Sequence, residues 1–283
     1  MRVIEHAIEN WTGPVRLVLL GDLHLGNAGT DEALVEETAR RLAGPDVYWI
    51  DLGDSIDAIN MHDPRFDPRT LPDWIGLADL ADLPAAQVAR YRHYFGAYGA
   101  NCLARLYGNH EWALQKHSER DVSAELNRAI DLDPARALGY SGFVRLRFRC
   151  MEGSKVHNTW TQTLYIHHGN GGGKLAGAKA GALERWPLAY DADIYAVGHT
   201  HTKLVLQKRR AGLSSKASAT EQQDQRRNIV HAGVLYASFG LPFIGRRRRC
   251  PSTLQLLDRP LRRFQAREHV GAQVFHAVVQ GNE

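Results

Sequence analysis

Five short apolar runs occur along the first 201 residues, and each ends in a polar turn that contains glycine. The runs with their turns are VRLVLLGDLH, VYWIDLGDSID, NCLARLYGNHE, TQTLYIHHGNG and ADIYAVGHTH. Apolar runs of this length with branched residues are typical of buried strands. Between the first two, the segment DEALVEETARRLAG has helical spacing and acids in its first turn. The order strand, helix, strand predicts an α/β fold, in which polar turns gather beyond the carboxyl ends of the strands.

Three other segments lack the pattern of a strand. Residues 61–100 begin with Asp and Pro punctuation and continue into Ala-rich sequence, which predicts an inserted helical cap. Residues 112–135 also have helical spacing. Residues 203–228 carry seven lysines and arginines against two acids, separated by Ser, Ala, Gln and Gly. We expect this last segment to be a mobile basic arm outside the sheet.

Composition narrows the class of protein. The chain has 283 residues, 44% of them hydrophobic, and we expect a single domain over 1–283. Its formal net charge of +4 agrees with an anionic substrate without requiring one. Three cysteines without CxxC spacing indicate neither a disulfide framework nor a thiolate zinc site, which favours a reducing cytoplasm. Without a signal-peptide pattern or a stretch of about 18 apolar residues, we expect a soluble protein with no membrane partner.

Taken singly, the polar turns have ordinary structural explanations. Asp22 and His24 could form a capped turn, because Asp readily bonds its own backbone. The segment 53–57 could be a turn followed by a helix cap. By contrast, His199 and His201 stand at i and i+2 of an extended segment, where they face the same way and can chelate one metal ion or flank two.

The five turns are more informative together. All follow strands of one chain, and they contain six of its 14 histidines. Carboxylate, imidazole and amide oxygen are suitable ligands for divalent ions such as Mn²⁺, Fe²⁺, Zn²⁺ and Ni²⁺. Thiolate is absent from the set, so a closed structural zinc site is not expected. The sequence therefore predicts a metal centre at the strand ends.

The ordered series Asp-x-His, Gly-Asp-x-x-Asp, Gly-Asn-His-Glu, His-Gly and Gly-His-x-His spans residues 21–201 and resembles that of the calcineurin-like metallophosphoesterase superfamily. The set is specific for the superfamily and not for a substrate. The resemblance implies a four-layer α/β/β/α sandwich with a small helical insertion and the site at one edge. It also implies two divalent metal ions, Mn²⁺ in the first place and Fe, Zn or Ni as alternatives. Two such ions lower the pKa of a shared water molecule and so provide a nucleophile at neutral pH.

Carried over by matching positions, the resemblance implies the ligands of both ions. The first ion would be held by Asp22, His24 and His201, the second by Asn109, His199 and a histidine of the 167–168 pair, and Asp54 would bridge the two. Within that pair His168 is assigned, because many relatives have the ligand histidine directly before Gly. His167 is the alternative, because other relatives space the histidine one residue from Gly.

Two further residues receive catalytic roles from the resemblance. His110 directly follows Asn109 and resembles the family histidine that protonates the leaving oxygen or stabilises the transition state. Asp57 would orient and charge that imidazole. A third metal ligand or a packing residue is the alternative for His110, and a helix cap is the alternative for Asp57. Glu111 is interpreted as structural support for its turn.

The sequence indicates the substrate less specifically than it indicates the metal centre. In phosphoprotein phosphatases of the superfamily an Arg follows the second Asp of Gly-Asp-x-x-Asp and binds phosphate, whereas Ala58 stands there in this chain. A phosphoserine phosphatase is therefore disfavoured. The basic segments 203–228 and 246–249 favour a nucleic acid or nucleotide, hydrolysed by a phosphodiesterase, nuclease or phosphatase, although such segments can also be plain solvated surface.

Other functions stay open. A small nucleotide or a nucleotide-sugar-lipid pyrophosphate is the alternative substrate, and a protein-binding scaffold with a vestigial site is the alternative of a different class. The intact set of ligands argues against the scaffold. Several aromatic residues could stack on bases or belong to the core: Tyr91, Tyr94, Phe95, Tyr98 and Phe143. No feature of the sequence indicates the oligomeric state.

Overall fold

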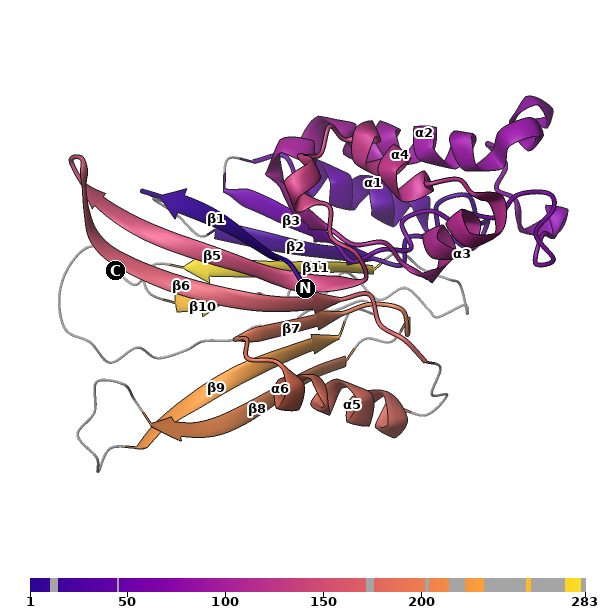
Figure 1. The fold of residues 1–283 in the computed structure, drawn as a ribbon. Coiled ribbons are helices and arrows are strands. Elements are labelled where there is room, and N and C mark those ends of the chain that lie inside the picture. Colours follow the sequence, from indigo (N-terminus) through magenta and orange to yellow (C-terminus); the bar gives the residue numbers. More distant parts are fainter. Residues whose placement is uncertain are drawn as a thin grey trace.

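The computed structural model describes residues 1–10, 15–44, 46–171, 176–201, 204–213, 222–231, 253–255 and 273–280. They form two mixed β-sheets (Figure 1). The first sheet has the strand order β1 (Val3–Glu9), β5 (Ser141–Glu152), β6 (Lys155–His167), β7 (Ile194–Val197), β9 (Gln222–His231) and β8 (Leu204–Leu213). The second has the order β10 (Thr253–Gln255), β11 (Gln273–Gln280), β2 (Val15–Gly21), β3 (Val47–Asp51) and β4 (Cys102–Arg105).

The two sheets pack face to face around the main hydrophobic core. Alternate residues of β2 point into it, and Leu17 and Leu19 are 2 to 3% exposed. Leu146, Leu164 and Ile166 come from the facing sheet and belong to the same buried cluster. This core fixes the distance between the two sheets, and with it the distance between the turns at their edges.

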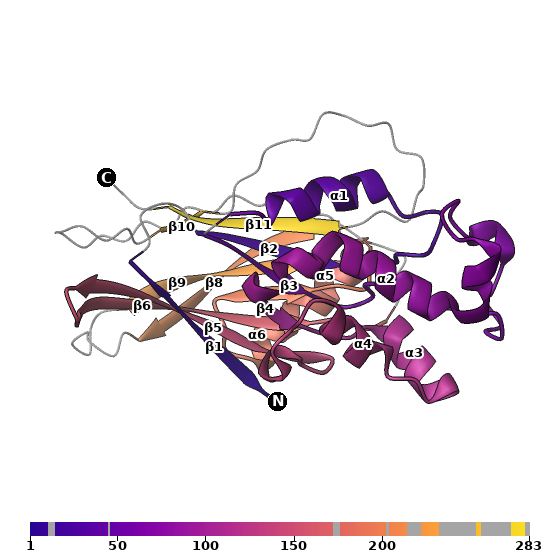
Figure 2. The ribbon, with the colours of Figure 1, turned by 90° about the horizontal axis from the view of Figure 1, so that it is seen from above.

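Helices cover the outer faces of both sheets (Figures 1 and 2). On the β2–β3–β4 sheet lie α1 (Glu32–Arg41), α2 (Leu83–Phe95) and α4 (Val122–Ala129), which share a second buried cluster with Val18, Leu20 and Trp49. On the β6–β7 side lie α5 (Ala176–Glu184) and α6 (Trp186–Ala189), whose Leu183 and Trp186 pack with Tyr165 and Tyr195. The prediction of a four-layer α/β/β/α sandwich is confirmed. Among the helices that the structure describes, none combines the length and apolarity needed to cross a bilayer.

The five predicted strands and the helix between the first two are all present. β2, β3 and β4 run parallel to one another, and β6 runs parallel to β7. Their carboxyl ends therefore meet at one edge of the sandwich. All five polar turns are at this edge, as the sequence predicts.

The prediction that residues 203–228 lie outside the sheet is wrong for the two parts of this segment that the structure describes, and the mobility of the segment stays a prediction. Leu204–Leu213 and Gln222–His231 form the antiparallel pair β8 and β9 at the end of the first sheet. Polar segments can form the same backbone hydrogen bonds to a neighbouring strand as apolar ones, so a polar and basic composition did not reveal these strands. In the register of the pair, Lys208 stands opposite Arg227 and Arg209 opposite Arg226.

Besides α2, the segment 61–100 contains the 3₁₀ turns η1 (Pro68–Thr70) and η2 (Leu77–Asp82) and all but the last residue of η3 (Gly96–Asn101). In α2, Tyr91 and Phe95 are wholly buried and Tyr94 nearly so, against the β2–β3–β4 sheet. These aromatic residues therefore belong to the core and not to a base-stacking surface. The helix is part of the outer layer, and a cap over the substrate by the rest of this segment stays a prediction.

β1 and β5 had no predicted counterpart, and neither did β10 and β11 of the second sheet. β1 pairs in parallel with β5, and Glu5 bonds Arg145 and Arg147 across this pair at 2.7 and 2.9 Å. The alternation FVRLRFR in β5 is the period-two signal that could have revealed it. α3 (Asn109–Ser118) precedes α4, and the 3₁₀ turn η4 (Pro134–Arg136) then leads towards β5.

Candidate metal centre

Three groups of side chains with metal-binding atoms lie at the strand ends. Asp22, His24 and His201 form the first group, and Asp54, His168 and His199 form the second; a third, His24, Asp57 and His110, shares His24 with the first. Within each group, one nitrogen or carboxylate oxygen of every residue lies within 4.8 Å of the others. The first two groups follow β2, β3, β6 and β7, so the first needs two turns distant in the chain to meet and the second needs three.

Left-handed backbone conformations aim these side chains inward. Asp22, His24, Asp54, His199 and His201 all have positive φ, between 47° and 75°. Gly adopts this region without cost, Asn, Asp and His adopt it more often than other residues, and it persists where the surrounding structure holds it. Five such residues in one place indicate that the turns are shaped to make the side chains converge.

Close backbone approach brings the β3 and β4 turns together. A Cβ atom on Gly53, which has φ +94°, would lie 2.5 Å from the backbone nitrogen of Gly108. A Cβ atom on Gly108 would lie 2.1 Å from an oxygen of Asp54. No side chain fits at either position, so both glycines are required. The missing side chain of Gly108 leaves room for the Asp54 carboxylate to reach the centre.

The first group is nearly closed around a common point. The Nε2 atoms of His24 and His201 are 3.2 Å apart, and His201 Nε2 is 3.9 Å from Asp22 Oδ1. Both oxygens of Asp22 accept the backbone N–H of His199, at 3.0 and 2.8 Å. Asp22 is wholly buried, whereas the His201 side chain is 35% exposed. The site therefore opens to solvent on the His201 side.

The second group shares Asp54 with the first. Asp54 Oδ2 lies 3.3 Å from His168 Nε2 and 3.9 Å from His24 Nε2, between the two groups. His168 Nε2 is also 3.1 Å from Asn109 Oδ1, and its Nδ1 is 2.8 Å from the backbone oxygen of Leu52. That carbonyl accepts from Nδ1–H and leaves Nε2 directed at Asp54 and Asn109.

His167 and His168 point to opposite sides of the sheet. The ring of His167 packs against Trp186, with centroids 4.4 Å apart, and its Nδ1 accepts the backbone N–H of Gly169 at 2.7 Å. His167 shares the outer face of β6 with Tyr165, while His168 continues the inner face of Ile166. Only His168 of this pair lies among the other candidate ligands.

His110 stands beside the two groups at the first turn of α3. Its backbone N–H donates to Asp54 Oδ1 at 2.9 Å, and its ring packs edge-on against His24 with centroids 4.5 Å apart. The Nδ1–H donates to the backbone oxygen of Asp57 at 2.7 Å. The Asp57 carboxylate is 3.7 Å from the Nδ1 atoms of both His110 and His24, which is too long for a hydrogen bond. The backbone of Asp57 thus orients His110, and its carboxylate adds charge at a distance.

Because the site is buried, the pKa of each acid and base in it depends strongly on the charges of its neighbours. Burial raises the pKa of Asp22 to about 7, with a further contribution from the charge of Asp54. Burial disfavours the protonated form of His168, but the hydrogen bond and charge of Asp54 outweigh it and raise the pKa of His168 to about 9. Burial and the charge of His24 lower the pKa of His201 to about 4.

This set of residues fits a pair of divalent cations. Asp22 and Asp54 are two buried carboxylates that interact with each other, and protonated histidines are the positive charges beside them. The facing Nε2 atoms of His24 and His201 offer lone pairs to the same point. Cations would neutralise the carboxylates and displace those protons, as metal binding to Asp and His generally does.

A buried polar network beneath the site was not predicted. Glu111 accepts the backbone N–H groups of Asp54, Ser55 and Gly108 at 3.1, 2.8 and 2.8 Å. This confirms its interpretation as support for the turn. Wholly buried Arg105 donates to Asp51 at 3.1 Å. The only sequence signal was an Arg at the end of an otherwise apolar run.

A comparison with protein families agrees with this geometry. The family model for calcineurin-like phosphoesterases matches residues 15–203, two thirds of the chain, which include every candidate ligand. No curated protein matches the chain. The match covers the strands that carry the five turns. This chain therefore belongs to the calcineurin-like phosphoesterase family and is a metal-dependent phosphoesterase.

Proposed function

We propose that this protein hydrolyses phosphodiester bonds of nucleic acids or nucleotides at a centre of two divalent cations. The observation that carries the proposal is the position of Asp54. Its carboxylate lies between two groups of buried candidate ligands and accepts the backbone N–H of His110. Ligands, bridging group and proton donor are thereby held in one unit. Mn²⁺ is the expected metal, with Fe, Zn or Ni as alternatives, and a cytoplasmic location remains a prediction.

The candidate ligands divide between two ions. Asp22, His24 and His201 would hold one ion, Asn109, His168 and His199 the other, and Asp54 both. The contacts of His168 with Asp54 and Asn109 support its choice over His167. When bound, two such cations polarise the phosphate and provide a water-derived nucleophile at neutral pH.

The chain's own residues handle the leaving group. Nδ1–H of His110 is bonded to the backbone of Asp57, so Nε2 is the atom free to carry a proton to the substrate. As the oxygen of water bonds to phosphorus, the bond from phosphorus to the leaving oxygen breaks, and that oxygen takes the Nε2 proton.

Nucleic acid is favoured by the basic residues of the first sheet. β8 begins three residues after His201, and its basic positions stand opposite basic positions of β9. At about 3.3 Å per residue, Arg209 is roughly 17 Å along the strand from Leu204. A strand of nucleic acid bound in the site could reach that distance, whereas a small nucleotide could not.

Metal analysis and matched histidine variants test the centre. Asp54→Asn should abolish hydrolysis and lower the metal content after reconstitution with Mn²⁺. His168→Ala should also lose metal, while His167→Ala should keep two ions per chain. Full activity in Asp54→Asn, or loss of metal in His167→Ala alone, would refute the assignment.

Kinetics test the role of His110. His110→Asn should lower kcat by about 10²–10⁴-fold while both ions stay bound. Nitrophenyl esters should lose less rate than alkyl esters, because a good leaving group needs little protonation. Equal losses would leave only electrostatic stabilisation for His110.

Salt dependence tests the substrate. Binding of a DNA or RNA oligonucleotide should weaken linearly on a log–log salt plot, and Arg209→Ala with Arg226→Ala should flatten the slope by about one unit per lost phosphate contact. Cleavage that ignores both salt and these arginines would favour a small nucleotide or pyrophosphate.

A further inference from the structure

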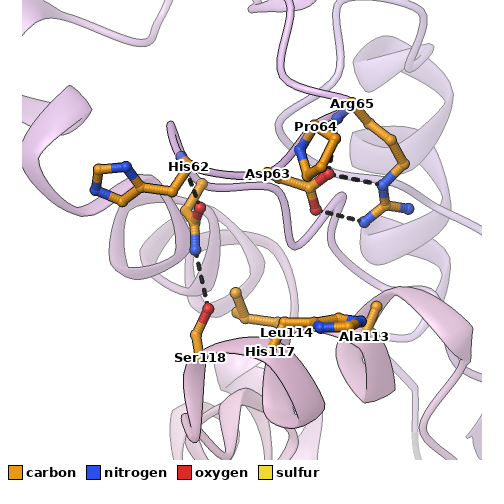
Figure 3. Close-up of a pocket in the computed structure, with 9 residues that line it drawn as sticks. His62, Asp63, Pro64, Arg65, Ala113, Leu114, His117 and Ser118 are labelled. Atoms are coloured by element: carbon orange, nitrogen blue, oxygen red, sulfur yellow. Dashed lines mark hydrogen bonds and ion pairs between the residues drawn. The ribbon is translucent and has the colours of Figure 1, made fainter.

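A pocket of about 440 Å³ lies between residues 60–65 and α3 (Figure 3). Its wall of loop residues faces the second and third turns of the helix. The lining residues are Asn60, His62, Asp63, Pro64, Arg65, Ala113, Leu114, His117 and Ser118. A bond of 3.1 Å from the amide of Asn60 to the hydroxyl of Ser118 ties the two walls at one end. A cavity of this volume is of the size that holds a small organic ligand.

Leu114 and His117, in the helical wall of the pocket, lie on the same face of α3 as His110. His110, Leu114 and His117 are at positions i, i+4 and i+7 of the helix, so they share a face. The other wall begins three residues after Asp57, whose backbone oxygen holds the His110 ring. In the proposed function His110 protonates the leaving oxygen, so the part of the substrate beyond that oxygen would lie beside the first turn of α3, next to this pocket.

Arg65 is the cation of the pocket. Its Nε and Nη2 donate to the two oxygens of Asp63 at 3.0 and 2.7 Å, and the backbone N–H of Arg65 donates to Asp63 Oδ1 at 2.8 Å (Figure 3). Within the described part of the chain, Nη1 has no hydrogen-bond partner. The side chain is 45% exposed. The guanidinium is thus fixed in direction and still has donors to offer.

The charges of the metal centre reach Arg65. The hydrogen bond to Asp63 is the main cause of its raised pKa, and the charges of Asp57 and Asp54 add to it. In the same way, the charge of His110 contributes to the lowered pKa of Asp63, after the larger effect of Arg65. The pair therefore lies within electrostatic range of the reacting groups.

We propose that this pocket binds the leaving group of the substrate and that Arg65 binds a second phosphate on it, an inference that rests on the proposed function. The substrate class is then a phosphodiester whose leaving group carries a phosphate of its own, as in an oligonucleotide. Ala113, Leu114 and Pro64 provide an apolar surface for the sugar and base. His117 lies about 10 Å along the helix from His110, which leaves room for one nucleotide unit. Arg65 is a specificity-determining residue in this arrangement.

Inhibition by product-like nucleotides tests the pocket. The Mn²⁺-loaded protein is assayed with bis(p-nitrophenyl) phosphate as substrate, and thymidine 3′,5′-bisphosphate and the 3′- and 5′-monophosphates are added as competitors. In the native protein the inhibition constant of the bisphosphate should be about tenfold lower than that of either monophosphate, from one charge-assisted contact. In Arg65→Ala this ratio should fall to about one.

Arg69 offers a matched control. It pairs with Asp67 through the same bonds, two residues apart, but its side chain is 88% exposed and does not line the pocket. Arg69→Ala should keep the tenfold ratio. A native ratio near one, a ratio that survives Arg65→Ala, or an equal loss in Arg69→Ala would overturn the proposal.

A separate measurement keeps the two proposals distinguishable. If bis(p-nitrophenyl) phosphate is not hydrolysed, the proposed function fails. Calorimetric titration of the Mn²⁺-treated protein with the same three nucleotides then tests the pocket directly. A bisphosphate preference that disappears in Arg65→Ala would support the pocket, and equal affinities for all three nucleotides would overturn it.

Discussion

Replacing Glu111 by Gln should destabilise both the fold and the metal centre. Oε2 of Glu111 accepts the N–H groups of Asp54 and Gly108, and Oε1 accepts that of Ser55. The carboxylate is wholly buried. In Glu111→Gln the best arrangement keeps the carbonyl at the Oε2 position, and its NH₂ group then faces the N–H of Ser55. One buried donor therefore loses its partner in any orientation of the amide.

The magnitude follows from the bonds that are lost. An unpaired buried donor costs about 1–3 kcal/mol, and the remaining two bonds lose their charge assistance. Burial raises the pKa of Glu111, with the charge of Asp54 acting in the same direction, so loss of the negative charge offsets part of this cost. We expect a net destabilisation of about 2 kcal/mol for Glu111→Gln. Glu111→Ala leaves three donors unpaired and should cost about 4 kcal/mol or more.

Denaturant unfolding and metal titration measure both effects. The free energy of unfolding should fall as stated, and the affinity for Mn²⁺ should fall by about 10–100-fold, because Asp54 is no longer held in position. Glu36→Gln is the matched control, since the Glu36 side chain is 59% exposed and should change stability by under about 0.5 kcal/mol. If Glu111→Gln unfolds at the same denaturant concentration as the control, the carboxylate does not hold the turns and the reasoning is wrong.

Three other changes test the surroundings of the site. Arg105→Met should lower the free energy of unfolding by about 3–5 kcal/mol, because Asp51 is left charged and buried. Adding Asp51→Asn should restore part of this stability, and a double variant less stable than Arg105→Met would contradict the reasoning. Burial, with the charge of Arg136, lowers the pKa of His6 below 6.5, so the stability from its neutral form is lost as the pH falls through 6.5 towards that lower value. His6→Gln should therefore gain stability relative to the native protein in urea unfolding between pH 7.5 and 5, and an unchanged difference would exclude the effect. Mn²⁺ at about 100 times its dissociation constant should stabilise chelator-treated protein by about 2.7 kcal/mol, seen as a raised Tm, and should not do so in Asp54→Asn.

The sequence by itself determined the strands that carry the site and the chemistry at their ends. The apolar runs before Asp22 and His199 form strands that are buried on both faces. Such strands can be recognised from their continuous apolar composition alone. Parallel strands then place their carboxyl ends at one edge without further information. The residue types in the turns indicated a metal centre for the same reason, because ligand chemistry belongs to the side chain and not to the fold.

Only the tertiary structure decided how these side chains are aimed and what surrounds them. The choice between His167 and His168 depends on which face of β6 meets the core, and the positive φ of Asp22 and Asp54 depends on contacts between separate turns. β8 and β9 gain their stability from pairing across the sheet, which their polar sequence does not record. Arg65 lies 45 residues from His110 in the sequence, and only the packing of its loop against α3 brings it beside the leaving group. Each of these features arises from contacts between residues distant in the chain, whose free energy is not contained in any local pattern.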